Sequence, residues 1–234
     1  MARVRVVVAA LAAGALLLAC GASTKGAPST TSTAVTKTTT TTAVVVGTAL
    51  AALDTIPIKG RAPKTGYARS EFGPAWADVD HNGCDTRNDI LQRDLRDIAF
   101  RPNTHDCVVI SGTLEEPYTG QTMQFDKAKA YFIQIDHVVA LGDAWQKGAQ
   151  QLTPEQREAF ANDPLELLAV NGSANESKGD GDAATWLPPN KPYRCAYVAR
   201  QVAVKAKWHL WMTAAEADAS RRVLARCPNE PLPR

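Results

Sequence analysis

The chain has 234 residues, of which 26 are basic and 24 acidic, so its formal net charge at pH 7 is only +2. This balance excludes a strongly basic protein that coats nucleic acid, and any affinity for phosphate must come from a local group of cations. About 180 residues follow position 50, which is enough for one domain with a sizeable core.

The N-terminus has the pattern of an export signal. Arg3 and Arg5 precede a short apolar run that ends at Ala19, shorter than the roughly 20 residues that a membrane span needs. The next residues resemble a bacterial lipobox, which implies cleavage before Cys20 and lipidation of its thiol. An ordinary secretory signal with a chance cysteine is the alternative. We therefore expect an exported protein, either anchored as a lipoprotein on the outer face of the cell membrane or secreted.

Three segments follow from this pattern. Residues 1–19 are the expected signal peptide. Residues 20–47 are rich in Ser, Thr and Ala without a period that would bury a face, so a disordered tether is expected there. Residues 48–234 form the expected folded domain, which begins with a short helix at 49–53. The lipid anchor is its only expected contact with a membrane, and no protein partner is predicted.

Four cysteines remain once Cys20 is set aside, namely Cys84, Cys107, Cys195 and Cys227. An even number in an exported chain predicts two disulfides, with three possible connectivities. We favour Cys84–Cys107 and Cys195–Cys227, because each pair then brackets a local segment. A structural zinc site is the alternative, although the chain has no C-x-x-C pair.

A polar stretch from 78 to 89 has the spacing of a calcium-binding loop. Asp78, Asp80 and Asn82 are followed by Gly83, and an acidic residue, Asp89, stands at the twelfth position. Asp is shorter than the usual bidentate Glu, and no clear helix leads into the loop. A turn that caps the next helix is therefore the alternative to calcium.

The next elements are predicted from periodicity. Ile90, Leu91, Leu95 and Ile98 have helical spacing and predict a helix over 88–99. Strands are expected at 107–112 and 122–125, joined through a turn at 117–120. Further helices are expected at 138–146, from Thr153 to about 161, at 193–207 and from Thr213 to about 227.

Two short segments carry the residues suited to catalysis. Residues 131–136 alternate in polarity and predict a strand, which leads directly into Asp136 and His137. The apolar run 165–170 predicts a second strand. It is followed by a turn and then by Asn175 and Lys178, whose spacing of three puts them on one side of a helix. A carboxylate is a hard oxygen ligand for a divalent ion, and a neutral imidazole accepts protons near pH 7.

This order resembles the HNH, or ββα-metal, nucleases, in which a strand ends in Asp-His, a second strand follows, and a helix supplies Asn or His, commonly with Lys one turn on. Other stretches resemble secreted bacterial HNH endonuclease family proteins related to the GmrSD restriction enzyme C-terminal domain. These stretches are residues 83–91, 117–120, 136–141 and 186–189. The resemblance implies a single α+β domain built around the ββα-metal motif, with supporting helices and two disulfides.

The resemblance also implies a metal-dependent endonuclease that hydrolyses phosphodiester bonds of DNA, with RNA as the alternative substrate. His137 would be the general base, and one divalent ion, Mg²⁺ or else Mn²⁺, would bind Asp136 and Asn175. Lys178 would contact a phosphate. The family's middle Asn, which orients the catalytic His, falls at Glu166, and Glu can take that role only by accepting a hydrogen bond.

Two further cations are candidates for binding the substrate. Arg87 lies in one of the family-like stretches, and Arg194 begins a basic run on the helix expected at 193–207. Surface salt bridges and a solvated helix face are the alternatives. Glu166 and the neutral charge balance also leave open a second function, that of a catalytically degenerate cell-surface binding module on the same fold.

Overall fold

A computed structural model describes residues 47–233, which belong to one compact unit of the chain, residues 41–234. The expected signal peptide, Cys20 and all of the expected tether except Gly47 lie outside the described residues. Among the helices of residues 47–233, none has the length and hydrophobicity of a transmembrane span. The described part is a mixed α+β domain, as expected.

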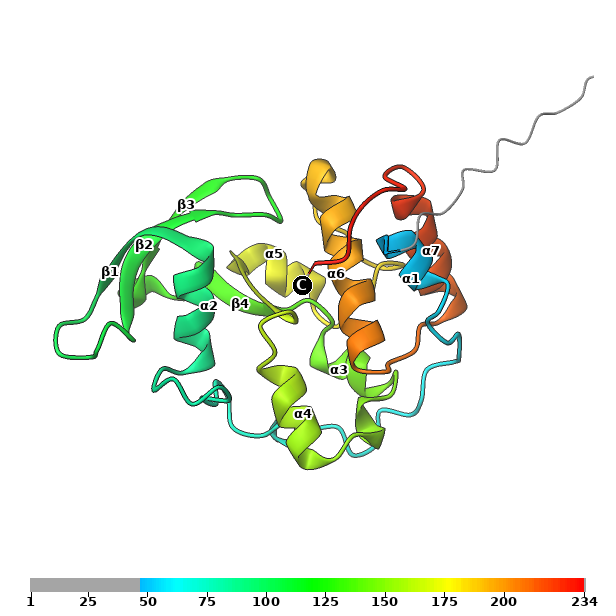
Figure 1. Cartoon of the computed structure of the whole chain (residues 1–234), viewed down its shortest axis with the longest axis horizontal. Coiled ribbons are helices and arrows are strands. Elements are labelled where there is room, and N and C mark those ends of the chain that lie inside the picture. Colours follow the sequence, from blue (N-terminus) through cyan, green and yellow to red (C-terminus); the bar gives the residue numbers. More distant parts are fainter. Residues whose placement is uncertain (1–46, 234) are drawn as a thin grey trace, which may run out of the picture. The chain divides into compact units, whose positions relative to one another are not determined.

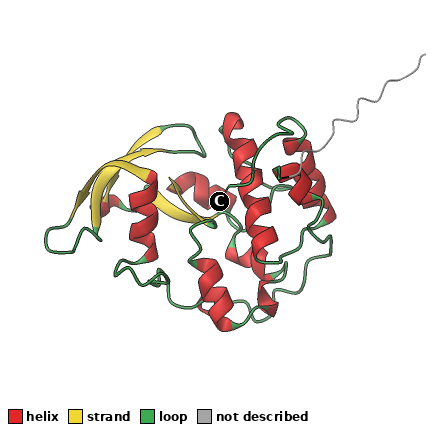
Figure 2. Cartoon of the chain, viewed as in Figure 1, coloured by secondary structure: helices red, strands yellow, loops and turns green. Residues whose placement is uncertain are grey.

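The strands form two separate antiparallel sheets (Figures 1 and 2). The first has the order β1 (Leu95–Phe100), β2 (Val109–Glu115) and β3 (Thr122–Asp126), and the second pairs β4 (Ile133–His137) with β5 (Leu167–Asn171). In the second sheet, Asp136 lies opposite Leu168 and His137 opposite Leu167. The expected strands 107–112, 122–125, 131–136 and 165–170 are therefore confirmed as elements, with ends that shift by up to three residues.

The helices pack around the second sheet, and most of them fill the side of the domain away from the first sheet (Figure 1). They are α1 (Ala49–Leu53), α2 (Thr86–Asp94), α3 (Leu141–Trp145), α4 (Pro154–Ala161), α5 (Gly172–Lys178), α6 (Arg194–Lys207) and α7 (Ala214–Leu224). The capping box predicted at Thr153 is present at the start of α4. Helix α3 is shorter than the predicted 138–146, and α7 ends three residues before Cys227.

The helix predicted over 88–99 is wrong in its second half. Helix α2 ends at Asp94, and Leu95 begins strand β1. Leu95 pairs with Leu114 across the sheet, and the left-handed backbone of Asp97 lies at an irregularity in the pairing. The tertiary pairing with β2 overrides the helical spacing, because the strand conformation also buries the Leu95 side chain.

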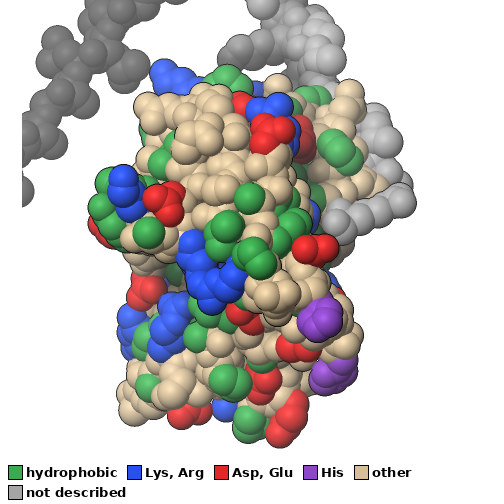
Figure 3. Space-filling model, turned by 90° about the vertical axis from the view of Figure 1, so that its left-hand side faces the viewer, with side chains coloured by type: hydrophobic (Ala, Val, Ile, Leu, Met, Phe, Trp, Pro, Cys, Tyr) green, Lys and Arg blue, Asp and Glu red, His purple; other side chains and the backbone are tan. Residues whose placement is uncertain are grey.

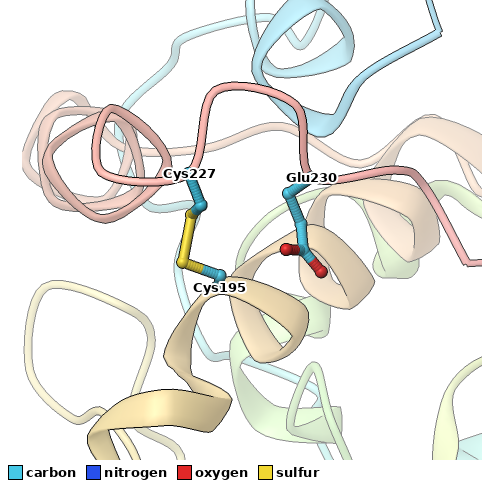
Figure 4. A group of neighbouring side chains, drawn as sticks. All are labelled: Cys195, Cys227 and Glu230. Carbon is cyan, nitrogen blue, oxygen red and sulfur yellow. A yellow bond between two sulfur atoms is a disulfide. The ribbon is translucent and has the colours of Figure 1, made fainter.

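Both predicted disulfides are confirmed. Cys84–Cys107 joins the chain before α2 to the chain before β2, and Cys195–Cys227 joins the first turn of α6 to the chain after α7. Figure 4 shows the second disulfide beside Glu230. Because its two sulfur atoms are bonded to each other, neither is a thiolate available to a metal ion.

Strand β5 lies between two parts of the hydrophobic core. Leu167 and Ala169 pack with residues of β2, β3 and β4, whereas Leu168 and Val170 pack against α6 and its neighbours. All four side chains are buried. This two-sided burial explains why the segment is an uninterrupted apolar run instead of an alternating one.

A buried network of charges holds the helical side together. The Nζ atom of Lys147 lies 2.7 Å from Asp143, 2.7 Å from Asp182 and 2.6 Å from Glu216. Arg61 reaches Asp143 and Asp182 from the surface, and Lys205 reaches Asp143 and Glu216. The three carboxylates are close enough to hold a metal ion, but the ammonium of Lys147 occupies the position between them.

Replacing Lys147 tests this network. Lys147→Met leaves buried carboxylates with too little positive charge, and we expect it to lower the free energy of unfolding by about 3–5 kcal/mol. The matched control is Lys64→Met, which breaks the exposed Lys64–Asp180 pair and should cost less than about 1 kcal/mol. Urea unfolding of both variants measures the difference. Equal effects would contradict the structural role given to Lys147.

Candidate active site

Asp136, His137 and Asn175 line one cleft of about 410 Å³. Its other polar side chains are Tyr67, Arg69, Arg87, Gln134 and Asp180, and Trp76 and Leu141 form part of its apolar wall. These residues come from segments that are far apart in the sequence and meet at a single surface opening only after the chain has folded. The sequence-predicted pair Asp136-His137 and the later Asn175 are therefore brought together.

The turn from β5 into α5 brings Asn175 next to β4. The side chain of Asn171 caps the helix by accepting a hydrogen bond from the Ala174 backbone N–H. Gly172 begins the helix, and a Cβ atom at this position would overlap the backbone oxygen of Tyr131. Only glycine permits so close an approach. One turn later, Asn175 Nδ2 donates to Gln134 Oε1 at 2.9 Å, which fixes the amide beside β4.

Asp136 is buried and held by two donors. Lys178 Nζ donates to one carboxylate oxygen at 2.9 Å, and the Tyr118 hydroxyl donates to the other at 2.5 Å. Burial raises the pKa of Asp136 above its ordinary value, and the charge of Lys178 and the two hydrogen bonds oppose that rise. Lys178 Nζ also donates to the backbone oxygen of His137 at 2.8 Å, and the lysine side chain is itself buried.

The imidazole of His137 has one nitrogen fixed by the backbone. Nε2 lies 3.0 Å from the backbone oxygen of Ala161. Since a carbonyl oxygen only accepts hydrogen bonds, Nε2 carries the proton, and the neutral ring has its lone pair on Nδ1. Burial, with the charges of Arg69 and Lys178 acting in the same direction, lowers the pKa of His137 to about 3. The ring is therefore neutral near pH 7, and it is stacked near Trp76.

Glu166 hydrogen-bonds to the backbone and not to the imidazole. Both carboxylate oxygens accept from the Val139 backbone N–H, at 3.2 and 3.1 Å, and no hydrogen bond joins Glu166 to His137 in the described part of the chain. The orienting contact that sequence reasoning assigned to Glu166 is made by the Ala161 carbonyl instead. Because that contact comes from the backbone at the end of α4, no local sequence pattern indicates it.

Two arginines give the cleft positive charge. Arg69 comes from the turn at 69–72 and Arg87 from the start of α2. The Arg87 guanidinium lies 6.0 Å from the ring centre of Trp76, and burial lowers its pKa. Neither arginine makes a salt bridge with any residue between 47 and 233. Sequence reasoning found Arg87 but assigned no role to Arg69, Trp76 or Tyr118, although Tyr118 lies in the family-like stretch 117–120.

Arg194 lies elsewhere. Its Nε donates to the backbone oxygen of Pro188, and it lines a separate depression with Lys191, Arg222 and Arg226. The structure therefore does not bring Arg194 to the cleft that contains His137.

The stretch from 78 to 89 forms a loop that runs into the first turn of α2. Asp78 accepts from the backbone N–H groups of Asn82 and Gly83, and the Asn82 amide donates to Asp80 and Asp89. The following helix is capped by Asp85, whose side chain accepts from the Asn88 N–H. These contacts match the alternative of a turn before a capped helix. Binding of calcium at Asp78, Asp80, Asn82 and Asp89 remains a prediction.

Comparison with known proteins identifies the family to which the chain belongs. The profile described as "GmrSD restriction endonucleases, C-terminal domain" matches residues 85–223, which include every residue of the cleft discussed above except Tyr67, Arg69 and Trp76. The chain belongs to this family. An "Uncharacterized secreted protein" of the fungus Arthroderma benhamiae is 35% identical over 182 residues, which cover 77% of this chain and 85% of that protein. Similarity therefore extends beyond the bacterial proteins that were expected. No solved structure matches the chain.

The pH dependence of stability tests whether Glu166 is buried away from water. Burial raises the pKa of Glu166 well above 4.5, so the stability that its protonated form contributes is present below about pH 4.5 and is lost as the pH rises through the raised pKa. Glu166→Gln cannot titrate. We expect the variant to gain stability relative to the parent by up to about 1.4 kcal/mol per pH unit within that window.

Urea unfolding of both proteins between pH 4.5 and pH 8 measures the effect. The control is Glu115→Gln, which makes the same Glu-to-Gln substitution at an exposed position. A difference between Glu166→Gln and the parent that does not change with pH would show that Glu166 is not desolvated.

Proposed function

We propose that the protein is a metal-dependent endonuclease of the ββα-metal type, which hydrolyses phosphodiester bonds of DNA or RNA. The observation that carries the proposal is the grouping in one cleft of a neutral imidazole, a buried carboxylate and an amide, beside two arginines that have no salt bridge among residues 47–233. The antiparallel pair β4–β5 followed directly by α5 has the order of elements of a ββα unit. Membership of a restriction endonuclease domain family supports a nuclease-related function.

The groups in the cleft fit a hard divalent ion. Asp136 offers carboxylate oxygens, each of which keeps a lone pair after accepting from Lys178 or Tyr118. Asn175 uses its amide nitrogen toward Gln134, so its oxygen is the atom available to a ligand. Two protein oxygens suit an ion such as Mg²⁺ or Mn²⁺, which keeps several waters and takes substrate phosphate as a ligand. When bound, such an ion would stabilise the negative charge of the transition state and of the leaving oxygen.

His137 is proposed as the general base. The Ala161 carbonyl holds the proton on Nε2 and thereby keeps the lone pair on Nδ1, which would accept the proton of the attacking water. The low pKa means that this nitrogen is free at neutral and mildly acidic pH. It also makes the imidazole a weak base, so positioning of the water has to supply much of the rate.

The cations divide into two roles. Lys178 was expected to contact phosphate, but its ammonium is buried between Asp136 and the His137 carbonyl. We therefore propose that Lys178 holds Asp136 in place. Arg69 and Arg87, which have no ion-pair partner among residues 47–233, would bind the phosphate oxygens. Arginine suits this role because its planar group donates two parallel hydrogen bonds to phosphate.

Export is part of the proposal. Two disulfides are typical of proteins that fold outside the cytoplasm, and the fungal relative is named as a secreted protein. The apolar leader ending before Cys20 supports the same location, with lipidation of Cys20 as a further proposal.

The test uses His137→Gln. Gln keeps a side-chain N–H donor for the Ala161 carbonyl but has no basic nitrogen, so we expect metal-dependent cleavage to fall by about 10²–10⁴-fold while the melting temperature changes by only a few degrees. Supercoiled plasmid and a structured RNA, each incubated with metal-stripped protein and added Mg²⁺ or Mn²⁺, measure cleavage.

His209→Asn is the matched control, because His209 is exposed and its left-handed backbone tolerates Asn. It should cleave at the parent's rate. If a folded parent protein cuts neither substrate with any added ion, the proposal fails.

A further inference from the structure

Two aromatic rings stand exposed just before strand β4. Tyr131 is 64% exposed and Phe132 52% exposed, and their ring centres are only 4.2 Å apart. Ile58 and Val79 are the other exposed large hydrophobic residues in the described part of the chain. Adjacent rings in contact with each other and with solvent are a feature of binding surfaces more than of a hydrophobic core.

Two lysines precede these rings by only a few residues in the chain. Lys127 and Lys129, on the short turn that follows β3, are both exposed and make no salt bridge with any residue from 47 to 233. The nearby Asp126 uses its carboxylate to accept from the Ala128 backbone N–H. Figure 3 shows the end of the molecule that carries the three-stranded sheet, where Lys and Arg side chains alternate with hydrophobic ones instead of forming one basic patch.

A short chain of hydrogen bonds joins the backbone that carries the rings to the cleft. Gln134 Nε2 donates to the Tyr131 backbone oxygen at 3.4 Å, and Gln134 Oε1 accepts from Asn175 at 2.9 Å. Phe132 precedes Asp136 by only a few residues, a span of at most about 14 Å in extended chain. A bound strand of nucleic acid would cross this distance within a few nucleotides.

We propose that Tyr131 and Phe132 form a stacking platform for unpaired bases, and that the substrate is single-stranded nucleic acid or the single-stranded part of a longer one. This inference rests on the proposed function and names the substrate class. Bases in a duplex already stack on each other and hide their faces, whereas bases of a single strand expose them to aromatic side chains. Lys127 and Lys129 would contact the phosphates on either side of the stacked bases.

An exposed ring pair beside lysines also suits an anionic lipid surface. Nucleic acid is favoured because Gln134, which donates to the Tyr131 backbone oxygen and accepts from Asn175, itself lines the cleft. The experiment therefore includes a lipid arm, and the proposal is overturned if the rings are needed for binding to vesicles but not for binding to the oligonucleotide.

Binding is measured in the full-length, oxidised chain carrying His137→Gln, with a chelator present so that no cleavage occurs. The probes are a fluorescent single-stranded oligothymidylate, a hairpin duplex of similar length and vesicles containing anionic lipid. We expect the single strand to bind more tightly than the duplex. Replacing both rings, Tyr131→Ala with Phe132→Ala, should weaken binding of the single strand by about 10- to 100-fold.

Two further double substitutions test whether the rings contribute to binding by stacking. Tyr131→Leu with Phe132→Leu keeps the apolar area but removes the rings, and should weaken binding as the alanine pair does. Tyr131→Phe with Phe132→Tyr keeps both rings, and should bind like the parent. Lys127→Gln with Lys129→Gln should reduce the slope of log affinity against log salt concentration by about 0.7 for each phosphate that is no longer neutralised.

Three results would overturn the platform. The first two are that the alanine pair, or the leucine pair, binds the single strand as tightly as the parent does. The third is that the alanine pair loses affinity for vesicles instead of for the oligonucleotide. Because binding is measured without metal and without cleavage, this outcome is separate from that of the proposed function. A chain that binds through the rings but never cuts would support the platform and refute the nuclease.

Discussion

One buried ammonium organises the candidate site. Lys178, at the last position of α5, donates to the Asp136 carboxylate and to the His137 backbone oxygen. It therefore fixes the end of α5 against the end of β4, and with it the position of Asn175 one turn earlier. The same ammonium compensates the buried charge of Asp136, whose isolation in the core would otherwise be costly. Because both partners are buried, this pairing is less screened by salt than a surface ion pair.

The charged groups around Lys147 and those at the cleft are arranged differently. Around Lys147 the charges are numerous and mutually paired, so they join α3, α6, α7 and the chain near Asp182 through ion pairs in the interior. At the cleft the charges are few. Asp136 is paired, His137 is neutral because burial and nearby cations lower its pKa, and Arg69 and Arg87 have no ion-pair partner among the described residues. A water-accessible cleft with such cations and a neutral imidazole favours an anionic ligand and leaves a nitrogen free to accept a proton.

Local patterns in the sequence predict the elements that carry the site, and tertiary contacts decide the rest. The Asp136-His137 strand end, the Thr153 capping box and both disulfides follow from spacing and composition. The helix expected over 88–99 fails at Leu95, since a residue that is buried in either conformation does not distinguish a helix from a strand. The Tyr118 hydroxyl and the Ala161 carbonyl act on Asp136 and His137 from distant segments, one of them through backbone alone. Neither contact leaves a local signal.

We propose that Asp136 and Asn175 together hold one divalent ion next to His137. The most direct test of this metal site follows the electron paramagnetic resonance signal of Mn²⁺, which weakens when the free ion binds. Mn²⁺ is titrated into metal-stripped full-length protein with an oligonucleotide present. We expect one bound Mn²⁺ per chain in the His137→Gln protein, and a weakening of that binding by about tenfold or more when Asp136→Asn or Asn175→Ala is added. Binding that is unchanged in both of these variants would contradict the proposed metal site.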